Sequence, residues 1–177
     1  MSGAKTNGNR ISWDCAHRIL DRVEPWLMQY AQRFARAGSY RRGKGTIGDL
    51  DVIMVPKTEL HLKDLVAHAV PMGMTYTGDK LSCVLSNEVT EGEGRTELEI
   101  WLSTPESFIN KLWFRTGSAQ FNIKMACAAR RQGWLLNQHH LCINRYAHPA
   151  DRRVEHFDSE ESLFSRLGVK FVLPEHR

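Results

Sequence analysis

The spacing of apolar residues predicts a helix followed by strands in the first third of the chain. Ser12, a common helix cap, precedes a stripe that recurs at helical spacing and consists of Ala16, Ile19, Leu20, Val23, Trp26, Leu27 and Tyr30. Pro25 lies inside this stripe, so we expect a kink or a break there. A short strand is expected from about Arg33. The alternating segment 49–55, which ends in a β-branched apolar run, predicts a second strand.

Similar patterns continue towards the C-terminus. We further expect a helix from Thr58 to about Ala69, strands at 72–77 and 81–86, a mobile hairpin loop at 87–95 and a strand through Glu99. Thr104 and Pro105 are typical of a helix start. Beyond them the sequence predicts helices near 105–113 and 118–132, a small sheet around 134–144 and a short helix at 159–167 that Gly168 ends.

These elements predict an α+β protein. A chain of 177 residues with 42% hydrophobic content can form one or two small cores. We expect a flexible N-terminus at 1–10, a first subdomain of strands and flanking helices at 11–103, and a small α/β subdomain at 104–177.

The segment 38–51 carries the residues with the clearest chemical meaning. A strand's period of two directs the side chains of Asp49 and Asp51 to the same face. Two adjacent carboxylates repel one another, and a bound cation relieves the repulsion. Mg²⁺ favours carboxylate oxygens together with substrate phosphate oxygens, so the pair predicts a metal site.

The residues just upstream are suited to binding phosphate. Gly38, Ser39 and Gly48 allow backbone N–H groups to approach a phosphate closely. Arg41 and Arg42 add charge-assisted hydrogen-bond donors. An Asp-x-Asp pair alone is more often solvated than metal-bound, and a Gly-Ser-Arg cluster alone is usually only a turn. Their succession in one segment favours a combined phosphate and metal site.

In this order the residues resemble a known family. Gly-Ser-Tyr-Arg-Arg-Gly at 38–43 and Gly-Asp-Leu-Asp at 48–51 resemble the signature of the nucleotidyltransferase superfamily. The double arginine resembles that of the family X DNA polymerases, the DNA polymerase beta-like family. The resemblance implies the palm fold of that family and a third metal-binding carboxylate on a neighbouring strand. Glu97 and Glu99 share one face of the segment 95–102, and the register to the next motif favours Glu99.

That next motif narrows the resemblance from superfamily to family. The segment 114–122 resembles the family X stretch that lines the pocket for the nucleotide sugar and base. By this resemblance, Phe114 and Gly117 lie against the incoming sugar and Asn122 reaches the minor-groove edge of the base. Ser118 could simply cap a helix, which is compatible with that role.

The resemblance implies a DNA-directed DNA polymerase that adds dNTPs to a primer 3′-hydroxyl and fills short gaps in DNA repair. Asp49 and Asp51 would bind two Mg²⁺ ions, for which Mn²⁺ can substitute, and Glu99 would bind the ion nearer the primer. The nucleotide phosphates would be held by the small and basic residues Gly38, Ser39, Arg42 and Gly48.

Several features depart from the family pattern. Arg115 replaces an aromatic residue, which puts ribose discrimination in question. Ala126 stands where an arginine contacts the template strand, which predicts low fidelity, and Ala119 replaces a residue that often contacts the incoming base. Only 37 residues precede Gly38, so we expect the minimal two-subdomain type, similar to the smallest viral members and without a lyase domain.

The charge distribution is suited to a nucleic-acid partner. The net charge is +4 at pH 7, and arginines are concentrated in the second half of the chain. A modest excess usually marks only a solvated surface. Next to a polymerase-like site, we interpret Lys124, Arg130 and Arg131 as DNA-binding residues and expect salt-sensitive binding.

Other features narrow the class of protein. The 4 cysteines show no Cys-x-x-Cys spacing, and no apolar run reaches the length of a membrane span. We therefore expect a soluble, intracellular monomer without a membrane partner. Trp113, beside the nucleotide motif, is the tryptophan that we consider for base stacking. Two alternatives stay open: a nucleotidyltransferase that is template-independent or acts on RNA or a small molecule, and a non-catalytic DNA-binding module.

Overall fold

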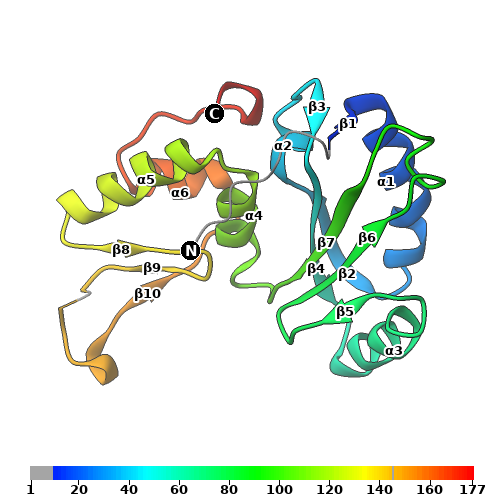
Figure 1. Cartoon of the computed structure of the whole chain (residues 1–177). Coiled ribbons are helices and arrows are strands. Elements are labelled where there is room, and N and C mark those ends of the chain that lie inside the picture. Colours follow the sequence, from blue (N-terminus) through cyan, green and yellow to red (C-terminus); the bar gives the residue numbers. More distant parts are fainter. Residues whose placement is uncertain (1–9, 145) are drawn as a thin grey trace.

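The computed structural model describes residues 10–144 and 146–177. Its elements form two lobes that meet where the helices α2 and α4 face one another (Figure 1). The first lobe contains β1 (Ile11–Ser12), α1 (Trp13–Leu27), β2 (Ala31–Arg36), α2 (Gly38–Arg41), β3 (Thr46–Ile47), β4 (Asp49–Pro56), α3 (Glu59–Ala69), β5 (Thr75–Tyr76), β6 (Lys80–Leu85) and β7 (Thr96–Leu102). The second contains α4 (Phe108–Thr116), α5 (Ala119–Arg131), β8 (Leu135–Leu136), β9 (Leu141–Cys142), β10 (Val154–Glu155) and α6 (Glu160–Arg166).

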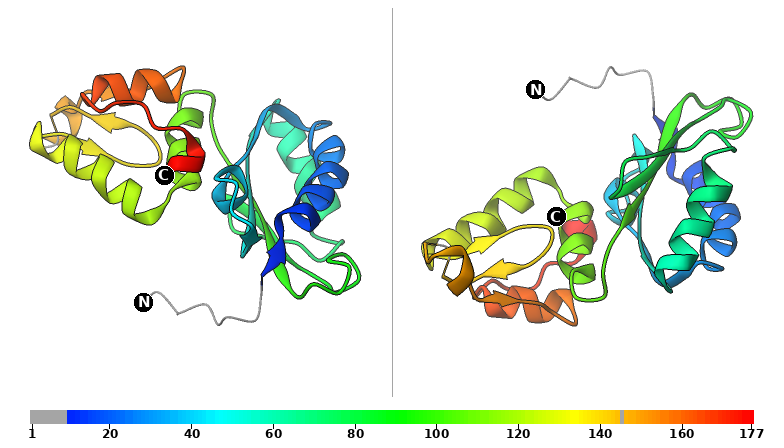
Figure 2. Two further views of the ribbon diagram at one scale, coloured as in Figure 1. Left: turned by 90° about the horizontal axis from the view of Figure 1, so that it is seen from above. Right: turned by 90° about the horizontal axis from the view of Figure 1, so that it is seen from below.

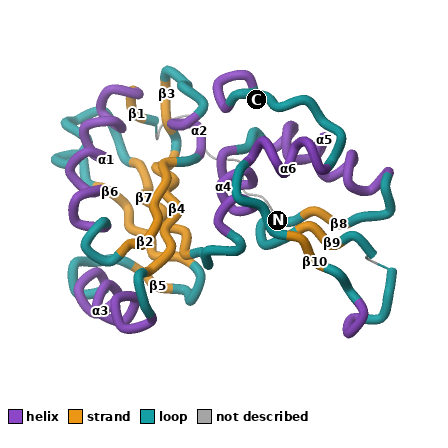
Figure 3. Tube along the Cα trace, turned by 180° about the vertical axis from the view of Figure 1, so that it is seen from behind, coloured by secondary structure: helices purple, strands orange, loops and turns teal. Residues whose placement is uncertain are grey.

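A five-stranded mixed sheet organises the first lobe. Its strand order is β2-β4-β7-β6-β5, with β4 and β7 parallel and the other neighbours antiparallel. Helices α1 and α3 cover one face, on the side away from the second lobe (Figures 2 and 3). Leu50, Val52 and Met54 of β4 are fully buried in the core beneath these helices. By the alternation of a strand, Asp49 and Asp51 point to the opposite face, towards the second lobe.

The second lobe has its own core. Its three short strands pair in the order β10-β9-β8, and α5 and α6 pack with them around Trp113 and Phe164. Trp113 is only 1% exposed, so the idea that it stacks on a base is wrong. A third apolar cluster joins the lobes, with Ile53 and Trp101 of the sheet packed against Phe108, Ile109 and Leu112 of α4.

Many helix boundaries follow the capping residues expected from the sequence. The hydroxyl of Ser12 accepts a hydrogen bond from the Cys15 N–H at the start of α1. Thr58, Ser118 and Ser159 cap α3, α5 and α6 in the same way. Helix α1 continues through Pro25 and ends two residues later, at Leu27. None of the helices within the described residues is both long and apolar enough to span a membrane.

Three local expectations need correction. The segment 87–95, predicted to be a mobile hairpin loop, is anchored to α1: the Glu93 carboxylate accepts hydrogen bonds from the Ser12 N–H and hydroxyl at 2.5 and 2.9 Å, and Arg18 pairs with Glu91. Helix α4 begins at Phe108 rather than near residue 105. The residues from Gly38 to Arg41, for which no helix was expected, form the short helix α2.

The N-terminal expectation is only partly addressed, because residues 1–9 lie outside the described residues. Ile11 and Ser12 form β1, which pairs antiparallel with β3, and this pairing was not predicted. Arg10 is hydrogen-bonded to Thr46 of β3. Residue 10 is therefore not part of a loose end.

A buried ion cluster also connects the lobes. The carboxylate of Glu160, at the start of α6, accepts hydrogen bonds from Arg41 of α2 and from Arg177, each at 2.7 Å. Arg41 also donates to the Thr116 hydroxyl at 2.8 Å. Burial alone would raise the pKa of Glu160, but the two arginines outweigh it and hold the pKa below its ordinary value.

We expect Glu160→Gln to lower the free energy of unfolding by about 3–5 kcal/mol, because it leaves two arginines without their buried counter-charge. Urea denaturation followed by circular dichroism measures this change. Glu161→Gln, an exposed substitution in the same helix, is the matched control and should leave stability nearly unchanged. Equal stabilities of the two variants would show that the cluster does not hold the lobes together.

The stabilisation by Glu160 should depend on pH. Because its pKa is depressed in the folded state, its contribution is fully present above the ordinary value of 4.5. It is lost as the pH falls below 4.5 through the folded-state pKa. The difference in unfolding free energy between the native sequence and Glu160→Gln should therefore be constant from about pH 5 upward and shrink at lower pH. A pH-independent difference would contradict this interpretation.

Candidate active site

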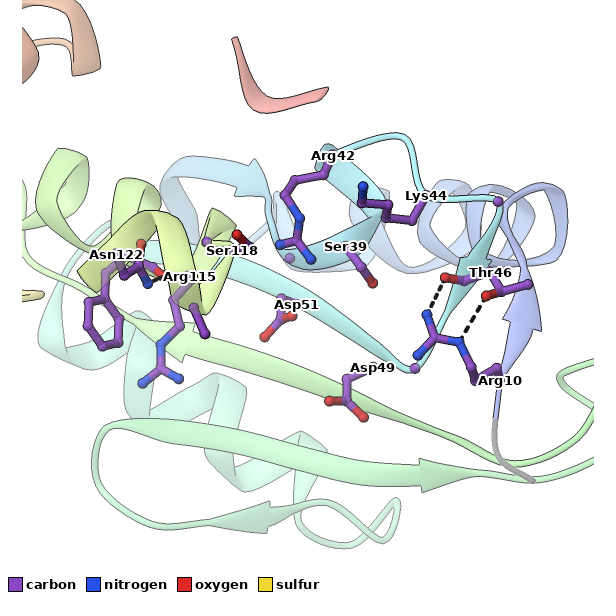
Figure 4. A pocket seen from close by; sticks show the side chains of 16 residues that line it. Arg10, Ser39, Arg42, Lys44, Thr46, Asp49, Asp51, Arg115, Ser118 and Asn122 are labelled. Carbon is purple, nitrogen blue, oxygen red and sulfur yellow. Dashed lines mark hydrogen bonds between the residues drawn. The ribbon is translucent and has the colours of Figure 1, made fainter. Parts of the chain in front are cut away.

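A pocket of about 750 Å³ opens between the lobes, over the exposed face of the sheet (Figure 4). It is lined by Asp49 and Asp51 and by every nucleotide-binding residue predicted from the sequence: Gly38, Ser39, Arg42, Gly48, Phe114, Gly117 and Asn122. The first four lie in α2, directly after it and directly before β4, and the last three lie in α4, between α4 and α5, and in α5. Tertiary structure thus brings two distant motifs to opposite walls of one cavity.

The carboxylates of the site are aligned by the parallel pairing of β4 with β7. In this register Asp51 lies opposite Glu99, and Asp49 lies opposite Glu97. Side chains at paired positions of neighbouring strands share a face, so the sheet presents acidic groups on its open side. Glu99 itself is not among the pocket-lining residues, and its carboxylate is bound by the Lys80 ammonium at 2.7 Å.

The surroundings of Asp51 make its ionisation costly. Burial raises the pKa of this carboxyl to about 7, and the nearby charges of Glu99 and Asp49 act in the same direction. Trp101 opposes the shift by donating its indole N–H at 3.2 Å, and the positive charge of Arg115 also opposes it. The ionised form of Asp51 is therefore unfavourable in this environment, and a bound cation would stabilise it.

The backbone at Gly38 lies close to the Asp51 carboxylate. Gly38 has a positive φ of 62°, and a Cβ built on it would lie 2.1 Å from Oδ2 of Asp51. Only glycine fits at this position, because any other residue would overlap the carboxylate and adopt an unfavourable backbone conformation. The glycine of the Gly-Ser motif is thus required by contact with the acidic motif.

The donor set fits a magnesium site that is completed by substrate. Within the part of the chain that the structure describes, no three His, Cys, Asp or Glu side chains are grouped closely enough to hold a metal ion by themselves. Mg²⁺ is usually bound through one or two carboxylates together with substrate phosphates, rather than by an all-protein cage. Adjacent carboxylates on the wall of this pocket are consistent with that pattern.

Buried polar atoms of the pocket also have unused bonding capacity. Arg42 donates to the Thr116 carbonyl, while its Nε is buried without a hydrogen-bond partner; burial lowers the pKa of this guanidinium. Asn122 donates its amide to the Phe114 carbonyl at 2.7 Å, but its Oδ1 is also buried without a partner. Such groups are unfavourable unless a ligand or water satisfies them.

The pocket contains basic residues that sequence reasoning missed. Arg10 lies at one end of it, bonded through Nε to the Thr46 hydroxyl at 2.9 Å, and its Nη1 lies close to Gly48. Lys44 also lines the wall. The two-residue pairing of β1 with β3 brings Arg10 there. A pairing so short has no periodic signal, so the sequence could not indicate this position.

The three predicted DNA-binding residues lie outside the pocket. Lys124, Arg130 and Arg131 are exposed on α5. Arg130 follows Ala119, which lines the pocket, by eleven residues or about three helical turns, and so lies on the same side of α5. Lys124 and Arg131, seven residues apart, share a different side of the helix. The structure therefore brings only Arg130 into line with the pocket.

Comparisons with known proteins agree with this geometry. Residues 111–177 match the family model of the DNA polymerase beta thumb. The chain is 28% identical over 166 residues to the DNA polymerase/3′-5′ exonuclease PolX of Bacillus subtilis, covering 92% of this chain and 27% of that relative. It is 22% identical over 152 residues to the repair DNA polymerase X of African swine fever virus isolate Tick/Malawi/Lil 20-1/1983, covering 83% of this chain and 82% of that protein.

The mixed sheet and the matched thumb define a nucleotidyltransferase fold of the polymerase beta-like type. Residues 111–177 are thus similar to the thumb of DNA polymerase beta, and the chain as a whole is similar to family X DNA polymerases. It spans about a quarter of the bacterial relative's length and most of the viral relative's.

The contact between Gly38 and Asp51 gives a prediction with an internal control. Gly38→Ala and Gly43→Ala both place a Cβ at a positive φ, 62° and 63°, but the space around Gly43 is open. Both variants should lose stability through backbone strain, and Gly38→Ala should lose about 1–3 kcal/mol more because of the clash. Urea unfolding of both variants measures the difference. Equal losses would mean that Asp51 moves aside freely.

Proposed function

We propose that the chain is a DNA-directed DNA polymerase that adds dNTPs to a primer 3′-hydroxyl by two-metal nucleotidyl transfer and fills short gaps during DNA repair. The observation that carries the proposal is the parallel register of β4 and β7, which aligns Asp51 with Glu99 beside a pocket lined by basic and glycine residues. Similarity to family X DNA polymerases supports the reaction class, and the similarity to the viral repair DNA polymerase X supports the role.

The acidic face of the sheet would hold two Mg²⁺ ions, with Mn²⁺ as a substitute. Asp49 and Asp51 would hold the ions, together with Glu99 on the primer side. Divalent ions supply charge neutralisation for an in-line displacement at phosphorus and lower the pKa of a bound hydroxyl. Glu99, which is paired with Lys80, would accept the proton of the primer hydroxyl.

The walls of the pocket would hold the nucleotide. Ser39, Arg42 and the backbone N–H of Gly48 would bind the outgoing pyrophosphate. Arg10 and Lys44, which line the same wall, would add positive charge there. A backbone that is free of side chains at Gly38 and Gly48 would let phosphate approach the start of β4.

The opposite wall would select the sugar and base. Phe114 and Gly117 would lie against the sugar, and the unpaired Oδ1 of Asn122 is suited to accept a hydrogen bond from a base edge. Arg42 bonds to the Thr116 carbonyl and links the phosphate side of the pocket to this sugar side. One arginine would therefore couple the positions of both parts of the nucleotide.

The two lobes would have different roles in the reaction. We assign residues 11–103 as the palm and 104–177 as the subdomain that binds nucleotide and template, working as a monomer. Lys124, Arg130 and Arg131 would contact the DNA backbone from α5, where they are exposed to a partner. The separate cores of the lobes and their apolar junction support this division.

Primer extension on DNA with a one-nucleotide gap tests the proposal. Each dNTP and NTP is offered separately with Mg²⁺ or Mn²⁺, and the template base should dictate which nucleotide is added preferentially. Untemplated addition would favour a terminal transferase, and activity confined to RNA or small molecules would favour another nucleotidyltransferase. Comparison with an open primer measures the preference for gaps.

In that assay Asp51→Asn should reduce the rate by about 10³-fold, since it removes a charge worth several kcal/mol at the reacting phosphate. DNA affinity, measured by fluorescence anisotropy, should stay within about twofold because the DNA contacts are left intact. Asp64→Asn, the same substitution at an exposed position of α3, is the control and should extend primers normally. Normal extension by Asp51→Asn would refute the assignment.

A further inference from the structure

Trp101 contacts Asp51 and a group that interacts with Glu99, two acidic residues of the site. This residue follows Glu99 by two positions on β7 and is 8% exposed. Its indole N–H donates to Oδ1 of Asp51 at 3.2 Å. The ammonium of Lys80 lies 4.8 Å from the centre of the indole ring and binds the Glu99 carboxylate at 2.7 Å. One side chain thus contacts both Asp51 and the partner of Glu99.

Arg115 of α4 packs on the same indole from the second lobe. The central carbon of its guanidinium lies 3.1 Å from the centre of a Trp101 ring, and its Nη2 donates to the Gln138 side chain at 3.0 Å. Figure 4 shows this guanidinium pointing away from Ser39 and Arg42, which form the phosphate side of the pocket. The geometry therefore favours an interaction with the sheet over one with the nucleotide phosphates.

The chemistry of this stack explains why an arginine suits the position. A planar guanidinium can lie flat on an aromatic ring and donate in its own plane to a fixed acceptor, and a lysine ammonium cannot do both. Gln138 restrains the guanidinium, the guanidinium restrains the indole, and the indole donates to Asp51. Three contacts in sequence link the turn after β8 to the acidic face.

We propose that Trp101 and Arg115 are positioning residues that hold Asp51 and, through Lys80, Glu99 in the orientation needed to bind divalent cations. This inference rests on the proposed function and deepens it. Carboxylates in close proximity turn away from one another unless neighbouring donors restrain them. Partners that orient metal-binding side chains typically contribute 10–100-fold to metal affinity or activity.

Two conservative variants test the proposal. Trp101→Phe keeps an aromatic ring for stacking but removes the N–H that Asp51 accepts. Arg115→Lys keeps the positive charge but removes the planar, two-point contact. Each should weaken binding of Mn²⁺ alone, measured by electron paramagnetic resonance, by about tenfold or more. In primer extension each should lower kcat by a similar factor and change KM for dNTP by less than about threefold.

A chemically matched control is available in the second lobe. Arg166 stacks on Trp134 at 4.1 Å and binds Glu155 at 2.6 Å, so it makes the same kinds of contact as Arg115. Arg166→Lys should leave Mn²⁺ affinity and kcat unchanged, because this arginine does not line the pocket. Gln138→Ala provides a milder variant, which removes only the restraint on Arg115 and should shift both quantities in the same direction by a smaller factor.

Wild-type Mn²⁺ affinity and kcat in Trp101→Phe and Arg115→Lys would overturn the proposal. So would a rise in KM for dNTP at unchanged kcat in Arg115→Lys, which would show that Arg115 contacts the nucleotide itself. If either variant unfolds, as judged by circular dichroism, Gln138→Ala decides in the same assays. The Mn²⁺ measurement needs neither DNA nor nucleotide. Failure of the proposed function would instead appear as absent templated extension by the native sequence.

Discussion

The pairing of the buried Glu160 carboxylate with Arg41 and Arg177 is the interaction on which the relation between the lobes depends. Glu160 and Arg177 lie in the second lobe and Arg41 in the first, so the ion pair of Arg41 with Glu160 crosses between the lobes. A buried charge left unpaired costs several kcal/mol. The neighbouring Arg42 extends the same junction to the Thr116 carbonyl, so the motif proposed to bind phosphate is held against the wall proposed to bind sugar. The contacts that stabilise the junction between the lobes therefore also set the shape of the pocket.

At the acidic face, the fold keeps groups that repel one another close together. Asp51 is enclosed, lies level with Glu99 and has a pKa near 7. The protein offsets this cost locally with the Trp101 N–H, the Lys80 ammonium and the charge of Arg115. A site that is costly without cations and partly compensated by its neighbours is suited to binding cations together with a substrate, because binding then removes a repulsion that folding has already imposed.

Arg115 shows how a departure from a family pattern can be interpreted physically. In the sequence it appears as a charged residue where an aromatic residue is expected, and that suggested a change in sugar selection. In the structure it stacks on Trp101 and bonds to Gln138, so its main contacts are with the sheet and the turn after β8. The substitution thus acts together with a tryptophan fourteen residues earlier in the chain, and neither position can be understood without the other.

Local signals in the sequence determined much of the fold and most of the candidate site. Capping residues placed the starts of α1, α3, α5 and α6, strand alternation placed Asp49 and Asp51 on one face, and the glycine and arginine motif indicated residues that line one wall of the pocket. Tertiary structure alone decided the position of Arg10, the anchoring of the segment 87–95, the burial of Trp113 and the ion cluster at Glu160. The reason is that caps and periodicity arise from neighbours in the chain, whereas these features depend on contacts between distant segments, which leave no periodic pattern in the sequence.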